Sequence, residues 1–226
     1  TSTTVYGSTC TVSADGAASI GVAADAFTDT AGNGNTVSNT YSWTQDDTGP
    51  TMTITSNTVD SGSSTNTGAV VLIYTSNEVT DDFATGDITV TECVHSDFTT
   101  ASTTVYGSTC TEATNAVTPT VLVAANTFTD ALDNDNSVSN TYTWTYDTTD
   151  PTMVITSNTI ASGGTTATAA VVLIYTSSEA TANFAAADIT DTGCTDDSFT
   201  TTSTTVYGST CTVAADGAAS IVVAAD

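Results

Sequence analysis

A long internal repeat is the feature of this sequence that most constrains its fold. The ten residues Ser-Thr-Thr-Val-Tyr-Gly-Ser-Thr-Cys-Thr occur at Ser2–Thr11, Ser102–Thr111 and Ser203–Thr212, at spacings of 100 and 101 residues. A period near 100 is too long for one turn of a solenoid and matches one complete β-sandwich domain. We therefore expect a tandem array of domains. Other landmarks keep the offset of 101: Trp43 with Trp144, Pro50 with Pro151, Tyr74 with Tyr175, and Cys93 with Cys194.

The boundaries between repeats are predicted at two short proline segments. Asp46–Pro50 and Asp147–Pro151 combine proline with Asp and Thr, and the first also contains Gly, which ends a strand and forms a stiff connector. Residues 49–149 are then a complete repeat, the middle repeat. Residues 1–48 are the C-terminal half of one copy, and residues 150–226 are the first three-quarters of another. We expect both partial copies to belong to a longer array.

Each complete repeat is predicted to hold about seven short strands. Apolar residues alternate with threonine, as in Met52 and Ile54, and this period of two is typical of strands. Clusters of Gly, Asn, Asp and Ser separate the segments, and no helical periodicity competes. The expected fold class is all-β, with tandem sandwich domains of about 100 residues. The expected strands of the middle repeat are residues 51–56, 68–74, 87–92, 96–99, 103–110, 120–125 and 139–146.

The charge of the chain excludes several kinds of partner. It has no Lys or Arg and 25 acidic residues, for a formal charge of −25. Such a surface repels phosphate backbones and anionic headgroups, so we expect no nucleic-acid partner. The longest apolar run, 169–175, has seven residues, against the roughly 18 that a membrane span needs. We therefore expect no membrane span in this segment, and divalent cations are the natural counter-ions.

At several places the residues resemble the tandem bacterial-type immunoglobulin-like (Big) repeats of surface adhesins, which also occur in extracellular filaments of algae and protists. The resemblance covers essentially the whole chain. It implies immunoglobulin-like domains and a structural role in stalks, adhesins or filaments. The matching segments are Asp147–Ser157, Tyr74–Glu78, Asp87–Thr89 and Phe27–Asn35.

The five cysteines fit one disulfide per repeat. Cys93 and Cys110 are 17 residues apart, and so are Cys194 and Cys211. The partner of Cys10 would precede Thr1. Bridges of this kind imply an oxidising compartment. The alternative is a metal site, but zinc requires Cys-x-x-Cys spacing or histidine ligands nearby.

Catalytic groups are not expected. The one histidine, His95, corresponds to Asp196 in the next copy, so it does not recur. There is no lysine, no glycine-rich phosphate loop and no nucleophile with a positioned base. The expectation is that the chain is not an enzyme and holds no catalytic cofactor.

Recurring acidic residues predict one cation site at each junction between repeats. In an up-and-down seven-strand sandwich, the domain entrance, the loop after the second strand and the loop before the last strand lie at one pole. Oxygen ligands in such numbers suit Ca²⁺. The alternative is that these residues only form turns. The candidates are Asp46, Asp47, Glu78, Asp87, Asp130 and Asn134, with Asp147, Glu179 and Asp188 at the next junction.

The strand Val70–Tyr74, repeated at Val171–Tyr175, is apolar on both faces. A sandwich strand with one solvated face should alternate, so the outward residues predict a lateral contact with another domain or chain. The alternative is that a central strand tolerates exposed β-branched residues. The interface candidates are Val71, Ile73, Val172 and Ile174.

Together these features predict a structural repeat protein at the cell surface or outside the cell. It would form a filament, surface hair or stalk by self-association. The alternative is the spacer of an adhesin whose binding head lies outside this sequence. No Asn-x-Ser/Thr sequon occurs, whereas the hydroxyl-rich segments 61–67 and 99–104 are candidate sites for O-linked glycans.

Overall fold

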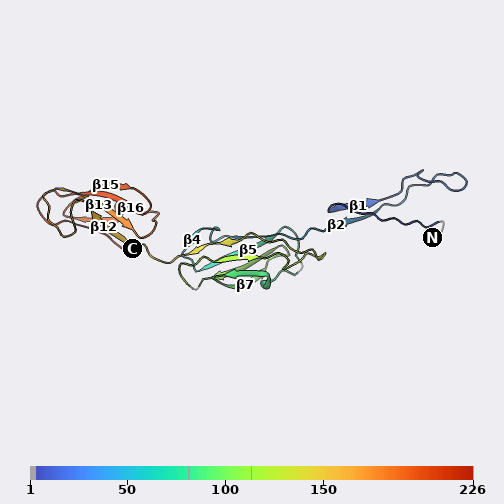
Figure 1. The fold of residues 1–226 in the computed structure, drawn as a ribbon, viewed down its shortest axis with the longest axis horizontal. Helices are drawn as coiled ribbons and strands as arrows, with labels where there is room; N and C mark the ends of the chain where they lie inside the picture. Colours follow the sequence, from blue (N-terminus) through green and yellow to red (C-terminus); the bar gives the residue numbers. More distant parts are fainter. Residues whose placement is uncertain (1–3, 81, 113, 226) are drawn as a thin grey trace. The chain divides into compact units, whose positions relative to one another are not determined.

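The computed structural model describes residues 4–80, 82–112 and 114–225, and its regular structure is almost entirely β-strand (Figure 1). The only helical segments in these ranges are the three-residue 3-10 turns η1 (Thr85–Asp87) and η2 (Ala186–Asp188). The all-β prediction is therefore confirmed. The chain separates into two compact units, Thr1–Thr148 and Thr149–Asp226. The division of the first unit at residue 49 stays a prediction. No described helix is long and apolar enough to span a bilayer.

The middle repeat is a sandwich of a four-stranded and a three-stranded sheet. The order β3-β5-β8-β7 in one and β10-β9-β6 in the other is that of constant-type immunoglobulin domains. The last strand is completed by β11, which pairs in parallel with β4. All seven predicted strands are present. Their bounds are β3 Met52–Ser56, β4 Ser64–Thr65, β5 Ala69–Ser76, β6 Ile88–Thr91, β7 Val94–Thr100, β8 Val105–Thr111, β9 Thr120–Val123, β10 Tyr142–Thr143 and β11 Thr145–Tyr146.

The expected up-and-down order is wrong. The chain crosses from one sheet to the other between β5 and β6, between β6 and β7, and between β8 and β9. The alternating sequence pattern fixes which face of each strand is buried. It carries no information about which strand is the neighbour, so the order of strands had to come from the structure.

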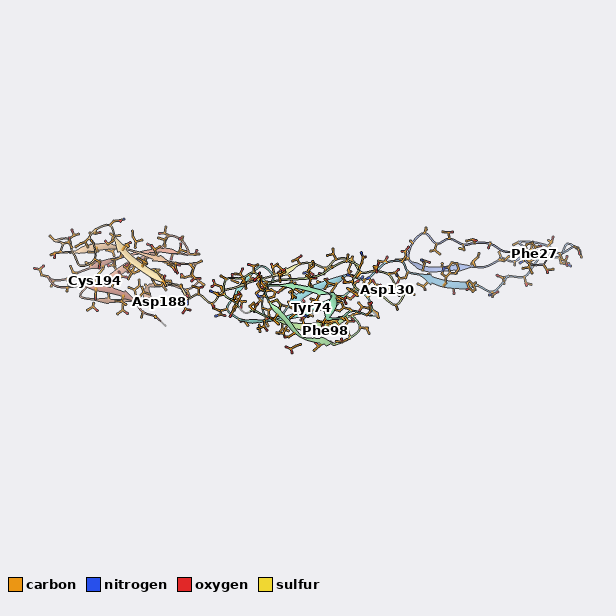
Figure 2. All side chains as sticks on the ribbon, turned by 60° about the horizontal axis from the view of Figure 1, so that its bottom comes forward. Phe27, Tyr74, Phe98, Asp130, Asp188 and Cys194 are labelled. Carbon is orange, nitrogen blue, oxygen red and sulfur yellow. A yellow bond between two sulfur atoms is a disulfide. The ribbon has the colours of Figure 1, made fainter. Side chains whose placement is uncertain are left out.

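The core of the middle repeat is built from the inward residues of both sheets. Val70, Leu72 and Tyr74 of β5 and Trp144 are completely buried. Phe83, from the loop after β5, packs its ring against four other aromatic rings, those of Tyr74, Phe98, Tyr106 and Phe128. Figure 2 shows Tyr74 and Phe98 within this repeat. Burial alternates along β5, so Val70, Leu72 and Tyr74 pack in the core while Val71 and Ile73 lie on the other face.

The C-terminal unit repeats most of this architecture. Its four-stranded sheet has the order β12-β13-β16-β15, and its second sheet consists of β14 and β17. Phe184 takes the place of Phe83, packing against Tyr175, Phe199 and Tyr207. The strand bounds are β12 Met153–Ser157, β13 Ala170–Ser177, β14 Ile189–Thr192, β15 Thr195–Thr201, β16 Val206–Thr212 and β17 Ser220–Val223.

Residues 4–48 form an antiparallel hairpin of β1 (Gly16–Ile20) and β2 (Tyr41–Gln45). These strands correspond to β9 and to β10 with β11 of the middle repeat. The apolar side chains of this segment have little cover: Phe27, between the two strands, is 62% exposed, and Tyr41 of β2 is 66% exposed. In the middle repeat, the corresponding Phe128 and Tyr142 are buried.

Candidate functional site

Three of the predicted acidic residues meet at the junction between residues 1–48 and the middle repeat. Asp46 follows β2, Glu78 follows β5, and Asp130 lies in the loop between β9 and β10. One carboxylate oxygen of each lies within 4.8 Å of the others. Figure 2 shows Asp130 at the end of the middle repeat. We call Asp46, Glu78 and Asp130 the junction cluster.

The Asp130 loop is organised by its own carboxylate. Oδ1 accepts hydrogen bonds from the backbone N–H groups of Leu132, at 2.8 Å, and Asn134, at 2.9 Å. The Asn134 side chain donates to Oδ2 at 2.9 Å and to the backbone oxygen of Asp46 at 3.4 Å. The bonds from Asn134 are the main cause that lowers the pKa of Asp130 below its ordinary value. The lowered pKa favours the ionised form of Asp130, so this residue places a negative charge at the junction.

Glu78 is the least satisfied member of the junction cluster. Its Oε1 atom is buried and has no hydrogen-bond partner among the described residues. Desolvation raises the pKa of Glu78, and the negative charges of Asp46 and Asp130 raise it further. Three convergent carboxylates without a cationic side chain form a site of strongly negative potential, and an oxygen-binding cation such as Ca²⁺ would relieve it.

Asp47 and Asp87 are not members of the junction cluster. The backbone N–H of Asp47 donates to Asp15 Oδ1 at 2.8 Å, and the hydrogen bond and negative charge of Asp15 raise the pKa of Asp47. Asp87 accepts a hydrogen bond from the Ala84 N–H at 2.8 Å, which closes η1. The alternative interpretation was that these acidic residues only form turns, and Asp87 fits it.

The second predicted set is divided between the two units. Asp147 belongs to the first unit, and Glu179 and Asp188 belong to the second. Asp188 accepts a hydrogen bond from the Ala185 N–H at 2.9 Å, as Asp87 does from Ala84. A cation site at this junction stays a prediction.

Two contacts that hold the connector were missed by the sequence analysis. Asp15 accepts hydrogen bonds from the Asp47 N–H and from the Thr48 hydroxyl. A side chain on Gly49 would place its Cβ 1.9 Å from the Asp135 carbonyl oxygen. The repeat carried a signal for the first contact, because Asn115 occupies the position of Asp15 in the next copy and accepts from Thr148 N–H at 2.6 Å.

Both predicted disulfides are present. Cys93 is bonded to Cys110 and Cys194 to Cys211, each with 5.7 Å between the Cα atoms. Cys10 is exposed and carries a free thiol in this structure.

The predicted interface residues lie on the outer face of the four-stranded sheets. Val71 is 46% exposed and Val172 is 50% exposed, while Ile73 and Ile174 are half-buried. The residues that alternate with them, such as Leu72 and Leu173, point into the cores. An apolar outward face therefore recurs on equivalent strands of both units.

Comparisons with known proteins give a weak structural similarity. No protein-family model matches the chain, and no curated protein matches it. Among solved structures, the chain is similar to FdeC, an Escherichia coli adhesin, with 13% sequence identity and a TM-score of 0.40. The match covers 92% of this chain and 79% of the FdeC chain. A similarity at this level carries no argument about function, and membership of the Big-repeat family stays a prediction.

Proposed function

We propose that this chain is part of an extracellular structural protein that associates with itself into a filament, surface hair or stalk. The observation that carries the proposal is the apolar outward face shared by β5 and β13, with Val71 and Val172 each about half exposed. Exposed valines at equivalent positions give each of these domains an apolar outer surface that suits lateral packing of copies. The disulfides support a location outside the cell.

The test of self-association is the double variant Val71→Asp, Val172→Asp. Electron microscopy of the assembled protein should show ordered filaments with the natural sequence and none with the variant. The matched control is Val79→Asp, because Val79 is 52% exposed but lies in a loop outside the sheet. Filaments that persist in the double variant would contradict the proposal, provided circular dichroism shows that both variants are folded.

A second candidate function is that of a spacer in a surface adhesin. It is favoured by the connector at residues 46–50, which is held by Asp15 on one side and by Asn134 on the other. Such fixed connectors would hold a terminal binding domain away from the cell. Electron microscopy separates the two functions, because a spacer would appear as single strings of domains and not as a lateral lattice.

For the junction cluster we propose Ca²⁺ as the ligand. Bound Ca²⁺ would neutralise the buried Glu78 oxygen and tie residues 1–48 to the middle repeat. We expect a Ca²⁺ concentration of about 100 times Kd to stabilise the junction by about 2.7 kcal/mol. Calorimetric titration should detect binding to the natural protein and not to Asp130→Asn. Asp133→Asn is the control, because Asp133 is exposed in the same loop. An unchanged melting curve in excess chelator would contradict the site.

O-linked glycans are a further proposal for the surface. Nearly all the hydroxyl residues of segments 61–67 and 99–104 are exposed. Intact-mass measurement of the native protein before and after chemical removal of O-glycans would test it.

A further inference from the structure

The Cys93–Cys110 disulfide of the middle repeat has a histidine beside it. β7 and β8 are antiparallel, and His95 of β7 lies directly opposite Cys110 of β8. Directly opposite residues point to the same face of a sheet, with Cβ atoms about 4.5–5.5 Å apart. Because Cys110 is completely buried, the imidazole also lies on the inner face, next to the disulfide. Its Nε2 atom is buried and has no hydrogen-bond partner among the described residues.

The next copy of the domain has a different group at this place. Its disulfide, Cys194–Cys211, is equivalent, but the residue opposite Cys211 is Asp196. Asp196 Oδ1 accepts a hydrogen bond from Ser209 Oγ at 2.5 Å. An ionised carboxylate only accepts hydrogen bonds, whereas a neutral imidazole has one N–H to donate. The two disulfides therefore have neighbours with opposite effects on a thiolate, which a donor stabilises and a negative charge destabilises.

The two sulfur atoms of the middle repeat differ in access. Cys93 is half-buried, whereas Cys110 is completely buried. In thiol–disulfide exchange, access decides which sulfur is attacked, and the other sulfur leaves as a thiolate. A thiol from solvent would therefore attack Cys93, and Cys110 would be the leaving group. The rate rises as the pKa of the leaving thiol falls, so a hydrogen-bond donor beside Cys110 favours this direction of attack.

We propose that the Cys93–Cys110 disulfide is an exchange site for small thiols, at which His95 stabilises the departing Cys110 thiolate. The thiolate of the small molecule attacks Cys93 Sγ and forms a new S–S bond with it. The Cys93–Cys110 bond breaks, and its electron pair leaves on Cys110 Sγ. The His95 N–H donates to this thiolate, which then takes a proton from water. The small thiol is oxidised to a mixed disulfide on Cys93, and Cys110 is reduced.

The charge of the chain gives His95 a special place in this chemistry. With no Lys or Arg and 25 acidic residues, the chain disfavours a thiolate almost everywhere, and His95 is its one histidine. Desolvation by burial lowers the pKa of His95 below its ordinary value, so the neutral imidazole, the form with one N–H, prevails at neutral pH. Exchange opens the loop that the disulfide closes, so small thiols would loosen the middle repeat. The proposal does not depend on self-association.

Exchange with glutathione tests the proposal on the full chain. Samples would be quenched in acid at intervals and digested with pepsin, and mass spectrometry would locate the adducts. The first adduct in the middle repeat should be on Cys93 and not on Cys110. His95→Asp, which introduces the residue of the next copy, should slow exchange at this disulfide by roughly tenfold. Cys194–Cys211 in the same molecules is the internal reference, and its rate should not change.

Two controls separate the effect of His95 from charge and stability. Ser96→Asp is the matched control, because Ser96 lies opposite Thr109 on the other face of the sheet, and its rate should be unchanged. Glu112, which follows β8 on the face of Cys110, is present in every variant, so its effect cancels. Urea unfolding would give the stability of each variant, and a loss of stability would speed exchange and not slow it.

A second pair of variants decides the outcome if circular dichroism shows that His95→Asp is unfolded. His95→Gln keeps an N–H donor and should retain the natural rate, whereas His95→Leu removes the donor and should slow exchange. A first adduct on Cys110, an unchanged rate in folded His95→Asp, or a natural rate in His95→Leu would each overturn the proposal. None of these results would affect the proposed self-association.

Discussion

At the scale of single residues, the equivalent core tyrosines Tyr74 and Tyr175 each have one serine hydroxyl partner. Tyr74 Oη lies 3.0 Å from Ser108 Oγ, and Tyr175 Oη lies 2.9 Å from Ser209 Oγ. Because Tyr74 is completely buried, its phenolate form is strongly disfavoured. Burial raises its pKa to about 12 from the ordinary 10.0. The same serine and tyrosine recur in both units, so the pair belongs to the repeat.

Tyr74→Phe should change the stability of the middle repeat in two ways. At neutral pH we expect a loss of about 1 kcal/mol, because one buried hydrogen bond is removed. In the natural protein the folded state holds the Tyr74 proton more tightly than the unfolded state. Its stability should therefore be complete below about pH 10 and should fall as the pH rises toward 12. Urea unfolding at several pH values should show a smaller alkaline loss in Tyr74→Phe.

Gly49→Ala should disturb the junction more than the small size of the added methyl group suggests. The added methyl group would meet the backbone carbonyl of Asp135 at 1.9 Å, so the connector or the loop must move. Overpacking of this kind costs about 1–3 kcal/mol. Gly86→Ala is the matched control, because a Cβ there meets nothing within 4 Å. Thermal unfolding would measure both variants, and equal melting temperatures would contradict the close approach.

The repeat allowed some residues of the junction to be predicted. It could not show which of the recurring acidic residues converge, and the reason is physical. Asp46, Glu78 and Asp130 converge because alternating strand directions bring their loops to one end. Asp87 recurs equally well, but its carboxylate accepts a hydrogen bond from the nearby Ala84 N–H. Recurrence of a residue indicates that the domain needs it. It does not indicate which neighbouring group the residue contacts.

At the scale of elements, the disulfide is the main covalent support of the four-stranded sheet. Cys110 lies in β8 and is completely buried. Its partner, Cys93, precedes β7, so the bond closes a loop around the β7–β8 hairpin. The same arrangement recurs at Cys194 and Cys211.

Replacing Cys93 and Cys110 together by Ser should destabilise the middle repeat by about 3 kcal/mol. A loop of 17 residues is closed by this bond, and opening it increases the conformational freedom of the unfolded chain. Guanidinium unfolding followed by the fluorescence of Trp144, in a Trp43→Phe background, would measure the loss. Cys10→Ser is the control, because Cys10 lies outside the middle repeat. A similar effect in the control would contradict the assignment.

The strands themselves were predictable from the period of two, whereas the way they pair was not. Every predicted segment of the middle repeat contains a strand, but β4 was missed because it has only two residues. The pairing β3-β5-β8-β7 depends on contacts between residues far apart in sequence. Local alternation cannot specify such contacts.

At the scale of the whole molecule, the absence of Lys and Arg leaves almost no attraction between charged side chains. With 25 acidic residues and no side-chain cation except a titrating histidine, charge interactions in the folded state are almost all repulsive. Salt should therefore stabilise the protein by screening. We expect the melting temperature to rise steadily from 10 mM to 1 M NaCl. A fall over this range would indicate attractive pairs that the composition does not provide.

The disulfide around the β7–β8 hairpin also sets how far each repeat can lengthen under tension. When a repeat is pulled from its two ends, the 17-residue loop between Cys93 and Cys110 cannot join the stretched chain. At about 3.5 Å per residue, an oxidised repeat releases about 60 Å less length than a reduced one. A chain of such domains would then extend in shorter steps, and a reducing environment would make it more extensible.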